Sequence, residues 1–146
     1  MYKNILIPTD GSELANKAVE HGITLAKAIG AKITFMIATL PFHVFTLDSQ
    51  VVEETSDQYK ERIKRHANST LSTVVATKAK AAGVPCHTVH VEHEPIYQAI
   101  IDSAKANDCD LITMASHGRR GVSALVLGSE TVKVLTHSTI PVLVHR

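Results

Sequence analysis

A chain of 146 residues has the size of one domain, and 45% hydrophobic residues supply enough apolar side chains for one core. A formal net charge of +1, three Phe, three Tyr and no Trp provide neither a positive field nor many stacking platforms, which argues against a nucleic-acid partner. No run of about 18 apolar residues is present, and the apolar start ends in a turn before signal-peptide length. We therefore expect a cytoplasmic protein without a membrane span.

Strands and helices alternate in the first half of the chain. The apolar run KNILIP (3–8) predicts a strand buried on both faces, and it ends in the turn signal PTDGS. Ser12 is a good N-cap for a helix whose apolar spacing continues to a C-cap at Gly30. KITFMIA (32–38) predicts a second strand. Residues 49–82 contain no Gly or Pro and keep a helical period, which indicates one long helix or two joined helices.

The second half continues the alternation. HTVHVEH (87–93) is typical of a half-covered edge strand, and it precedes a helix from Ile96, a strand from Leu111, a helix over 128–138 and the short strand PVLV (141–144). This order predicts one α/β domain over residues 1–146, with a doubly wound five-stranded parallel sheet and helices on both faces. Ligands of such sheets lie beyond the carboxyl ends of the strands, where the winding reverses.

The loop after the fourth strand has the composition of an anion-binding segment. In MASHGRRGVSALVLGSE (114–130), Gly118, Gly121 and Gly128 allow positive φ and close approach of the backbone, and Ser129 and Thr131 place hydroxyls at a helix N-terminus. Glycines that merely shape a surface loop explain this spacing equally well. A P-loop is excluded because no Gly-Lys pair occurs, and a dinucleotide fingerprint is excluded because the first strand ends in PTDGSE.

Three segments together resemble the universal stress protein family over essentially the whole chain: ILIPTDGS (5–12), ASHGRRGVSALVLGS (115–129) and HSTIPVLV (137–144). ATP-binding members look like Gly-x-x-Gly, nine residues, then Gly-Ser/Thr. Gly118, Gly128 and Ser129 match that pattern, and Ala115 stands where the motif has its first glycine. The resemblance implies a Rossmann-like strand order 3-2-1-4-5 and an ATP-binding regulatory or adaptor module of the stress response.

The resemblance also implies the residues of the site. Adenine would lie near Ala38, and the first strand's loop would reach the base and ribose, with Asp10 on a ribose hydroxyl or a metal. Mg²⁺ would bridge the phosphates. The expected contacts are Pro8, Thr9, Asp10, Ala38, Met114, Ala115, Gly118, Gly128, Ser129, Glu130 and Thr131. Arg119 and Arg120 fit either phosphate contacts or a solvated basic loop.

Three functions remain open at this stage: a nucleotide-binding module, a stress-family protein that acts through protein contacts without nucleotide, and an enzyme that uses ATP, at most as a slow ATPase. The resemblance adds a homodimer through the last strand and a protein partner that it does not identify. We predict neither a metal site at His87, His90 and His93, which alternate between strand faces, nor hydrolase chemistry at the adjacent Ser116 and His117.

Overall fold

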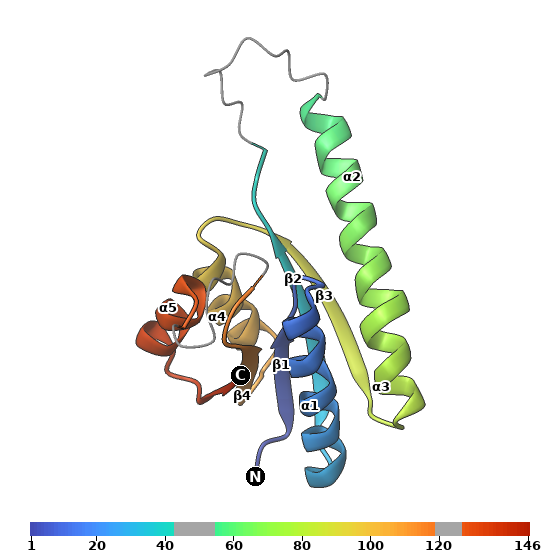
Figure 1. Cartoon of the computed structure of the whole chain (residues 1–146), viewed down its shortest axis with the longest axis vertical. Helices are drawn as coiled ribbons and strands as arrows, with labels where there is room; N and C mark the ends of the chain where they lie inside the picture. Colours follow the sequence, from blue (N-terminus) through green and yellow to red (C-terminus); the bar gives the residue numbers. More distant parts are fainter. Residues whose placement is uncertain (43–54, 119–126) are drawn as a thin grey trace.

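The computed structural model describes residues 1–42, 55–118 and 127–146, which form a layered α/β structure (Figure 1). Its sheet has the order β3-β2-β1-β4-β5, and all pairs of neighbouring strands are parallel. The strands are β1 (Asn4–Pro8), β2 (Lys32–Thr39), β3 (Cys86–Glu92), β4 (Leu111–Ala115) and β5 (Val142–His145). The predicted fold class and strand order are confirmed.

Helices cover both faces of the sheet. The long helical run α2 (Ser56–Ser69), η1 (Thr70–Ala76) and α3 (Thr77–Ala81) lies with α1 (Glu13–Ile29) on one face, while α4 (Ile96–Ala106) and α5 (Ser129–His137) lie on the other (Figure 1). The predicted long helix is therefore confirmed over 56–81. Its middle part, η1, is a π-helix, which the hydrophobic spacing did not indicate. Residues 49–54 lie outside the described part of the chain.

Local signals end the elements where the sequence predicts. Ser12 caps α1 by accepting a hydrogen bond from the Ala15 N–H at 3.2 Å, and Gly30 closes the helix in the left-handed conformation at φ 70°. Thr55 and Gln58 form a reciprocal capping box at the start of α2. Gly128 is the N-cap of α5 rather than its first helical residue, so this helix begins one position later than predicted.

The apolar run of β1 is explained by burial on both faces. Ile5 and Ile7 pack in the core beneath α1 and the α2–α3 run, whereas Leu6 packs beneath α4 and α5, and all three are fully buried. Complete burial of such a side chain contributes about 1.5–3 kcal/mol. Because the chain crosses to the other face after β3, the winding reverses between β1 and β4.

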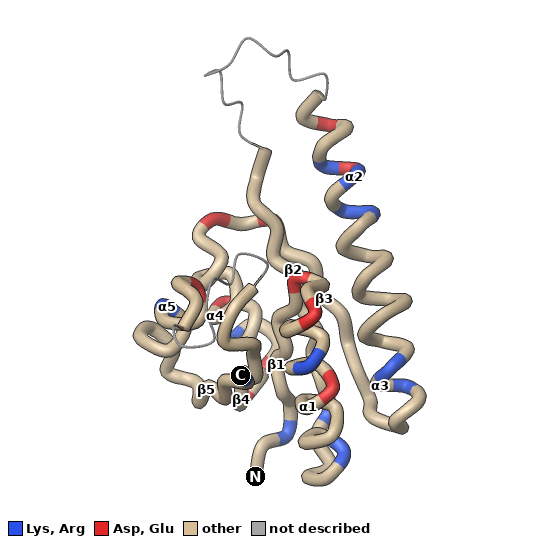
Figure 2. Tube along the Cα trace, viewed as in Figure 1, with Lys and Arg blue, Asp and Glu red and all other residues tan. Residues whose placement is uncertain are grey.

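Charges of both signs are interspersed over the described helices and loops (Figure 2). This distribution agrees with the near-zero formal charge of the sequence. Among the described helices, none has both the length and the apolar character needed to cross a membrane.

Candidate functional site

The turn after β1 is held by its own polar side chains. The Thr9 N–H donates to the Met36 carbonyl of β2 at 2.8 Å, which continues the sheet one residue beyond β1. Asp10 Oδ1 accepts from the Ser12 N–H at 2.9 Å, and Gly11 takes a positive φ of 77° between them. The start of α1 and the Asp10 carboxylate are thus fixed together at the carboxyl edge of the sheet.

The loop after β4 reaches this turn at Gly118. A Cβ built on Gly118 would lie 2.7 Å from Asp10 Oδ2, closer than real side-chain contacts allow. The contact joins two segments that are more than 100 residues apart in the sequence and that leave neighbouring strands. A side chain at position 118 would therefore force the Asp10 carboxylate to move, and this part of the predicted site is brought together by the fold.

The β4 loop also closes onto the start of α5. The Gly128 N–H donates to the Ser116 carbonyl at 2.8 Å, and a Cβ on Gly128 would lie 3.1 Å from that same oxygen. The Thr131 hydroxyl is within 3.1 Å of the Ala115 carbonyl and 3.3 Å of the Ser116 carbonyl. The φ of Gly128 is −62°, so of the two reasons given for the loop glycines, positive φ and close approach, only close approach applies here.

The N-terminus of α5 points its free amides toward this edge. No side chain caps the helix, because its N-cap is a glycine, and no hydrogen bond joins the Ser129 hydroxyl to the described residues. The Glu130 carboxylate is used elsewhere: Oε2 accepts from the Tyr97 N–H at the start of α4 at 2.9 Å, and Oε1 lies 3.2 Å from Lys133 Nζ. Glu130 can therefore offer its backbone amide to a ligand, while its side chain stabilises α4.

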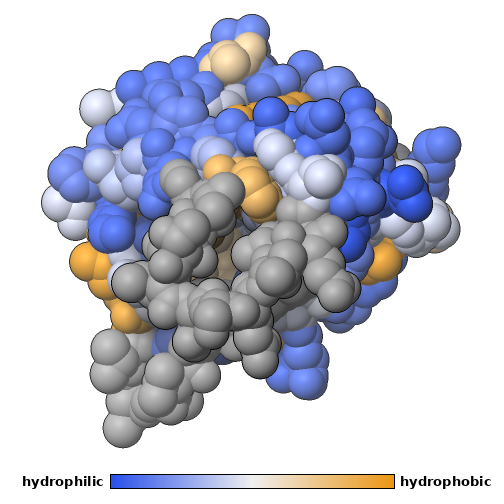
Figure 3. Space-filling model, turned by 90° about the horizontal axis from the view of Figure 1, so that it is seen from above, coloured by the Kyte–Doolittle hydropathy of each residue, from blue (hydrophilic) through white to orange (hydrophobic). Residues whose placement is uncertain are grey.

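Two apolar residues of the expected site belong to the core on the α4–α5 face. Met114 is 6% exposed within the core cluster of the α4–α5 face, and Ala38, near the end of β2, packs against the same cluster. The surface at this end of the molecule is mostly hydrophilic, with a small apolar patch beside the undescribed segments (Figure 3). Arg119, Arg120 and Gly121 lie outside the described residues.

The side chains of Ser116 and His117 lie close together, although the residues are adjacent in the sequence. Ser116 Oγ is 2.9 Å from His117 Nδ1, and His117 Nε2 is buried without a hydrogen-bond partner among the described residues. Ser116 is only 2% exposed, and no carboxylate of the described residues is bonded to the imidazole. The pair lacks both the orienting acid and the accessible hydroxyl that a serine nucleophile needs.

The histidines at and just after the end of β3 do not form a metal cluster: His87 and His90 belong to the strand, and His93 follows its last residue. His90 Nε2 lies 2.8 Å from the Thr39 hydroxyl, and burial lowers the pKa of His90 below its ordinary value. The described part of the chain contains no group of three or more His, Cys, Asp or Glu that could hold a metal ion.

Sequence reasoning missed one close pair of histidines. His21 of α1 and His145 of β5 face each other with their Nδ1 atoms 3.1 Å apart. Burial lowers the pKa of His145, and the nearby His21 lowers it further by a smaller amount. The two residues are 124 positions apart in the sequence, so no local pattern indicates this contact.

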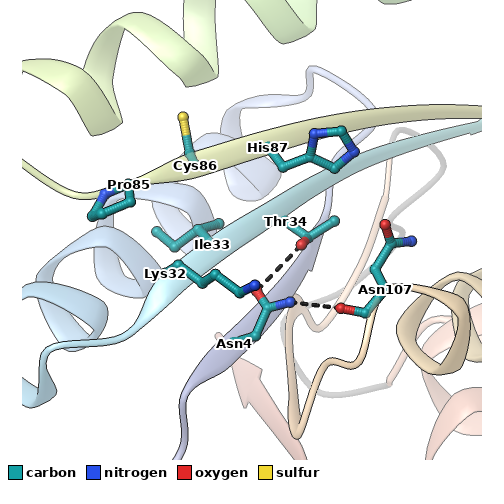
Figure 4. Close-up of a pocket in the computed structure, with 8 residues that line it drawn as sticks. All are labelled: Asn4, Lys32, Ile33, Thr34, Pro85, Cys86, His87 and Asn107. Atoms are coloured by element: carbon teal, nitrogen blue, oxygen red, sulfur yellow. Dashed lines mark hydrogen bonds between the residues drawn. The ribbon is translucent and has the colours of Figure 1, made fainter.

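A hollow of about 200 Å³ lies at the opposite edge of the sheet, near the amino ends of β1, β2 and β3 (Figure 4). Its floor is paired internally, because Asn4 Nδ2 donates to the Asn107 carbonyl at 2.8 Å and Thr34 Oγ1 donates to Asn4 Oδ1 at 3.2 Å. The residues that line it are Asn4, Lys32, Ile33, Thr34, Pro85, Cys86, His87 and Asn107. Since its buried polar groups already have partners, we assign no ligand to this hollow.

Taken together, the fold and the site define a doubly wound α/β protein with its candidate ligand site at the switch point between β1 and β4. The model of one family, described as the universal stress protein family, matches residues 1–146. The chain therefore belongs to the universal stress protein family.

Relatives match this chain over most or all of their length. The chain is 30% identical over 146 residues to a universal stress protein of Thermus aquaticus, with all of both chains covered. It is 29% identical to universal stress protein MJ0531 of Methanocaldococcus jannaschii, over 99% of this chain and 82% of the relative. The structure of protein MJ0577 from the same organism superposes with a TM-score of 0.81 at 27% identity, over 99% of this chain and 95% of the other.

Proposed function

We propose that the protein binds ATP with Mg²⁺ at the carboxyl ends of β1 and β4 and acts as a nucleotide-dependent regulatory or adaptor module. The observation that carries this proposal is the β4–α5 junction, where the Gly128 backbone approaches Ser116 and the amides of α5 remain uncapped. Such a junction suits a phosphate group, because the amides and the helix dipole both favour an anion.

The phosphates would lie against the start of α5. The Ser129 hydroxyl and the backbone N–H groups of Ser129, Glu130 and Thr131 can donate to phosphate oxygens. The Thr131 side chain instead supports the loop, because its hydroxyl is within bonding distance of the Ala115 carbonyl, at the end of β4, and of the Ser116 carbonyl just after it. Mg²⁺ would be held largely by the phosphates and by water, as this ion usually is.

The base and ribose would lie nearer β1 and β2. Met114 and Ala38 provide an apolar wall for adenine, and the turn of Pro8, Thr9 and Asp10 lies at the same edge. Solved structures of other family members support adenine nucleotides as the ligand class. One, a complex with cAMP, superposes with a TM-score of 0.69 at 23% identity, and another, an Archaeoglobus fulgidus protein in complex with dAMP, with 0.68 at 16%.

Retention of ATP, rather than rapid hydrolysis, follows from the acids at the site. Glu130 and Asp10 are the acids of the expected site. The Glu130 carboxylate accepts from the Tyr97 N–H of α4 and pairs with Lys133, and the Asp10 carboxylate accepts from the Ser12 N–H. Fast phosphoryl transfer needs a base, a metal and cations aimed at the transition state. We therefore expect phosphate release well below about 1 s⁻¹. Release at several per second that Asp10→Asn abolishes would establish an ATPase instead.

Calorimetry with paired α5 variants tests the binding site. Ser129→Ala should weaken MgATP binding about tenfold, the effect of losing one hydrogen bond to a charged group, and should leave adenosine binding unchanged. Thr136→Ala is the matched control, since this hydroxyl lies in the last turn of α5 and donates to the Val132 carbonyl. Absence of ATP binding in the unmodified protein would overturn the proposal and favour action through protein contacts alone.

The proposal extends to partners and location. We propose a homodimer that joins two copies through β5 and a protein partner that distinguishes the nucleotide states. We place the protein in the cytoplasm, where ATP is available.

A further inference from the structure

The His21–His145 pair joins α1 to the last residue of the edge strand β5, whose backbone bonds to Ser116 beside the proposed nucleotide site. Nδ1 of one ring faces Nδ1 of the other at 3.1 Å, and the ring planes are tilted by 55°. Two explanations fit a short distance between imidazole nitrogens: a direct N–H···N hydrogen bond, or two ligands placed around one metal ion.

The ring positions fit the second explanation. Two metal–nitrogen bonds of about 2.0–2.1 Å, with nitrogens 3.1 Å apart, subtend about 100° at the ion, between the square-planar and tetrahedral angles. The centre of an imidazole ring lies about 1.15 Å from its Nδ1 atom. Two rings bound to one shared ion would therefore have their centres about 4.8 Å apart, whereas two rings joined by a straight hydrogen bond would have them about 5.4 Å apart. The ring centroids of His21 and His145 are 4.9 Å apart.

We propose that His21 and His145 form a two-histidine site for a divalent late first-row transition metal, with Zn²⁺ as the probe ion. Neutral imidazole suits Zn²⁺, Ni²⁺ and Cu²⁺, whereas Mg²⁺ and Ca²⁺ require oxygen ligands. The nearest acid along α1, Glu20, pairs with Lys78 at 2.8 Å, so it does not compete for the imidazoles. The ion would hold the end of β5 against α1.

The surroundings limit the affinity. Because the described residues contain no group of three ligating side chains, water would complete the coordination. With the metal on Nδ1, His145 carries its proton on Nε2, and this buried atom has no partner among the described residues. Both facts predict binding weaker than at sites with three or four protein ligands.

The test is Zn²⁺ titration of the nucleotide-free, chelator-treated full chain by calorimetry. We expect one ion per chain, with affinity reduced at least tenfold by His21→Asn and, separately, by His145→Asn. His21 is on the exposed surface of α1, so its variant should fold even if the β5 variant does not. His87→Asn, an exposed histidine of β3, is the matched control and should bind as the unmodified chain does.

Spectroscopy supplies a second readout that surface binding would not give. With Cu²⁺, the electron paramagnetic resonance spectrum should show coupling to two nitrogens, reduced to one in His21→Asn. Equal Zn²⁺ affinity in the unmodified chain and both site variants, or no binding at all, would overturn the proposal and leave the pair as a hydrogen bond. Neither result depends on whether the chain binds ATP.

Discussion

At the residue scale, the glycines of the site are explained by contact distances. Gly118 lies against Asp10, and Gly128 lies against Ser116, so a side chain at 118 would displace the Asp10 carboxylate and one at 128 would crowd a carbonyl of its own loop. Positive φ values among the described glycines occur at Gly11, in the turn after β1, and at Gly30 and Gly83, outside the site. A motif of glycines can thus reflect close packing between segments even where the backbone torsions suit any residue.

Ala115→Gly tests whether the missing glycine of the motif limits nucleotide affinity. Ala115 ends β4 and is 8% exposed, and its carbonyl lies 3.1 Å from the Thr131 hydroxyl. Removing the methyl group should let the nucleotide approach more closely and tighten MgATP binding about threefold, while the added flexibility lowers stability by about 0.5–1 kcal/mol. Calorimetry and urea unfolding measure the two effects. Weaker binding would show that the methyl group contacts the ligand favourably.

His90 should make stability depend on pH. Burial is the largest influence on the pKa of His90 in the folded state, and it lowers this pKa. The charge of Glu92 raises the pKa by less, and the charge of Lys64 lowers it by less still. The unfolded chain therefore binds more protons than the folded chain below the ordinary histidine pKa of about 6.5, so stability falls as the pH drops from there. From pH 7.5 to pH 5.5, the urea midpoint of unfolding should fall more for the unmodified chain than for His90→Gln. The glutamine amide of this variant can still reach Thr39. A parallel fall in both proteins would contradict this assignment.

At the element scale, one glycine sets how closely α1 packs on the sheet. A Cβ on Gly22 would overlap Cδ1 of the buried Ile7 and lie 3.2 Å from Cγ2 of Thr113. The helix can therefore approach β1 and β4 only while this position has no side chain.

A double-mutant cycle tests this packing. Gly22→Ala should destabilise the chain by about 1–3 kcal/mol through overpacking, although alanine favours helix. Ile7→Val removes the overlapping methyl group, so Gly22→Ala should be nearly neutral or stabilising in that background. Urea unfolding of the four proteins gives the coupling. Additive effects would show that Ile7 is not the obstacle.

At the scale of the whole molecule, β5 leaves one sheet edge open. Ile112 N–H bonds to the Pro141 carbonyl and Ser116 N–H to the His145 carbonyl, so the alternating Val142 and Val144 turn their backbone groups away from β4. Leu143 is 40% exposed on this strand. These features suit the proposed pairing of β5 with a second copy.

Val144→Pro tests the dimer because it removes an amide from the open edge and none from the β4 ladder. Light scattering should show a dimer for the unmodified chain at micromolar concentration and a monomer for the variant, with circular dichroism confirming that both are folded. A stable monomer of the unmodified chain, or a dimer that survives the substitution, would contradict pairing through β5.

Much of the architecture was predictable because its causes are local. The apolar run of β1 shows burial on both faces, Ser12 and Gly30 mark the ends of α1, and alternation of strands and helices leads to a parallel sheet. The same reasoning placed the candidate site at the carboxyl edge, because ligands of such sheets bind where the winding reverses. The π segment η1 was not predictable, since hydrophobic spacing does not distinguish hydrogen-bond registers within one helix.

The sequence by itself determined the order of elements, the two-faced sheet and the family motif, since propensity, capping and periodicity act over a few residues. Only the tertiary structure decided that Gly118 meets Asp10, that the Glu130 side chain serves α4 and that His21 faces His145. These contacts join residues between 33 and 124 positions apart. They arise from the positions of the helices on the two faces of the sheet. These positions depend on the packing of all core side chains together.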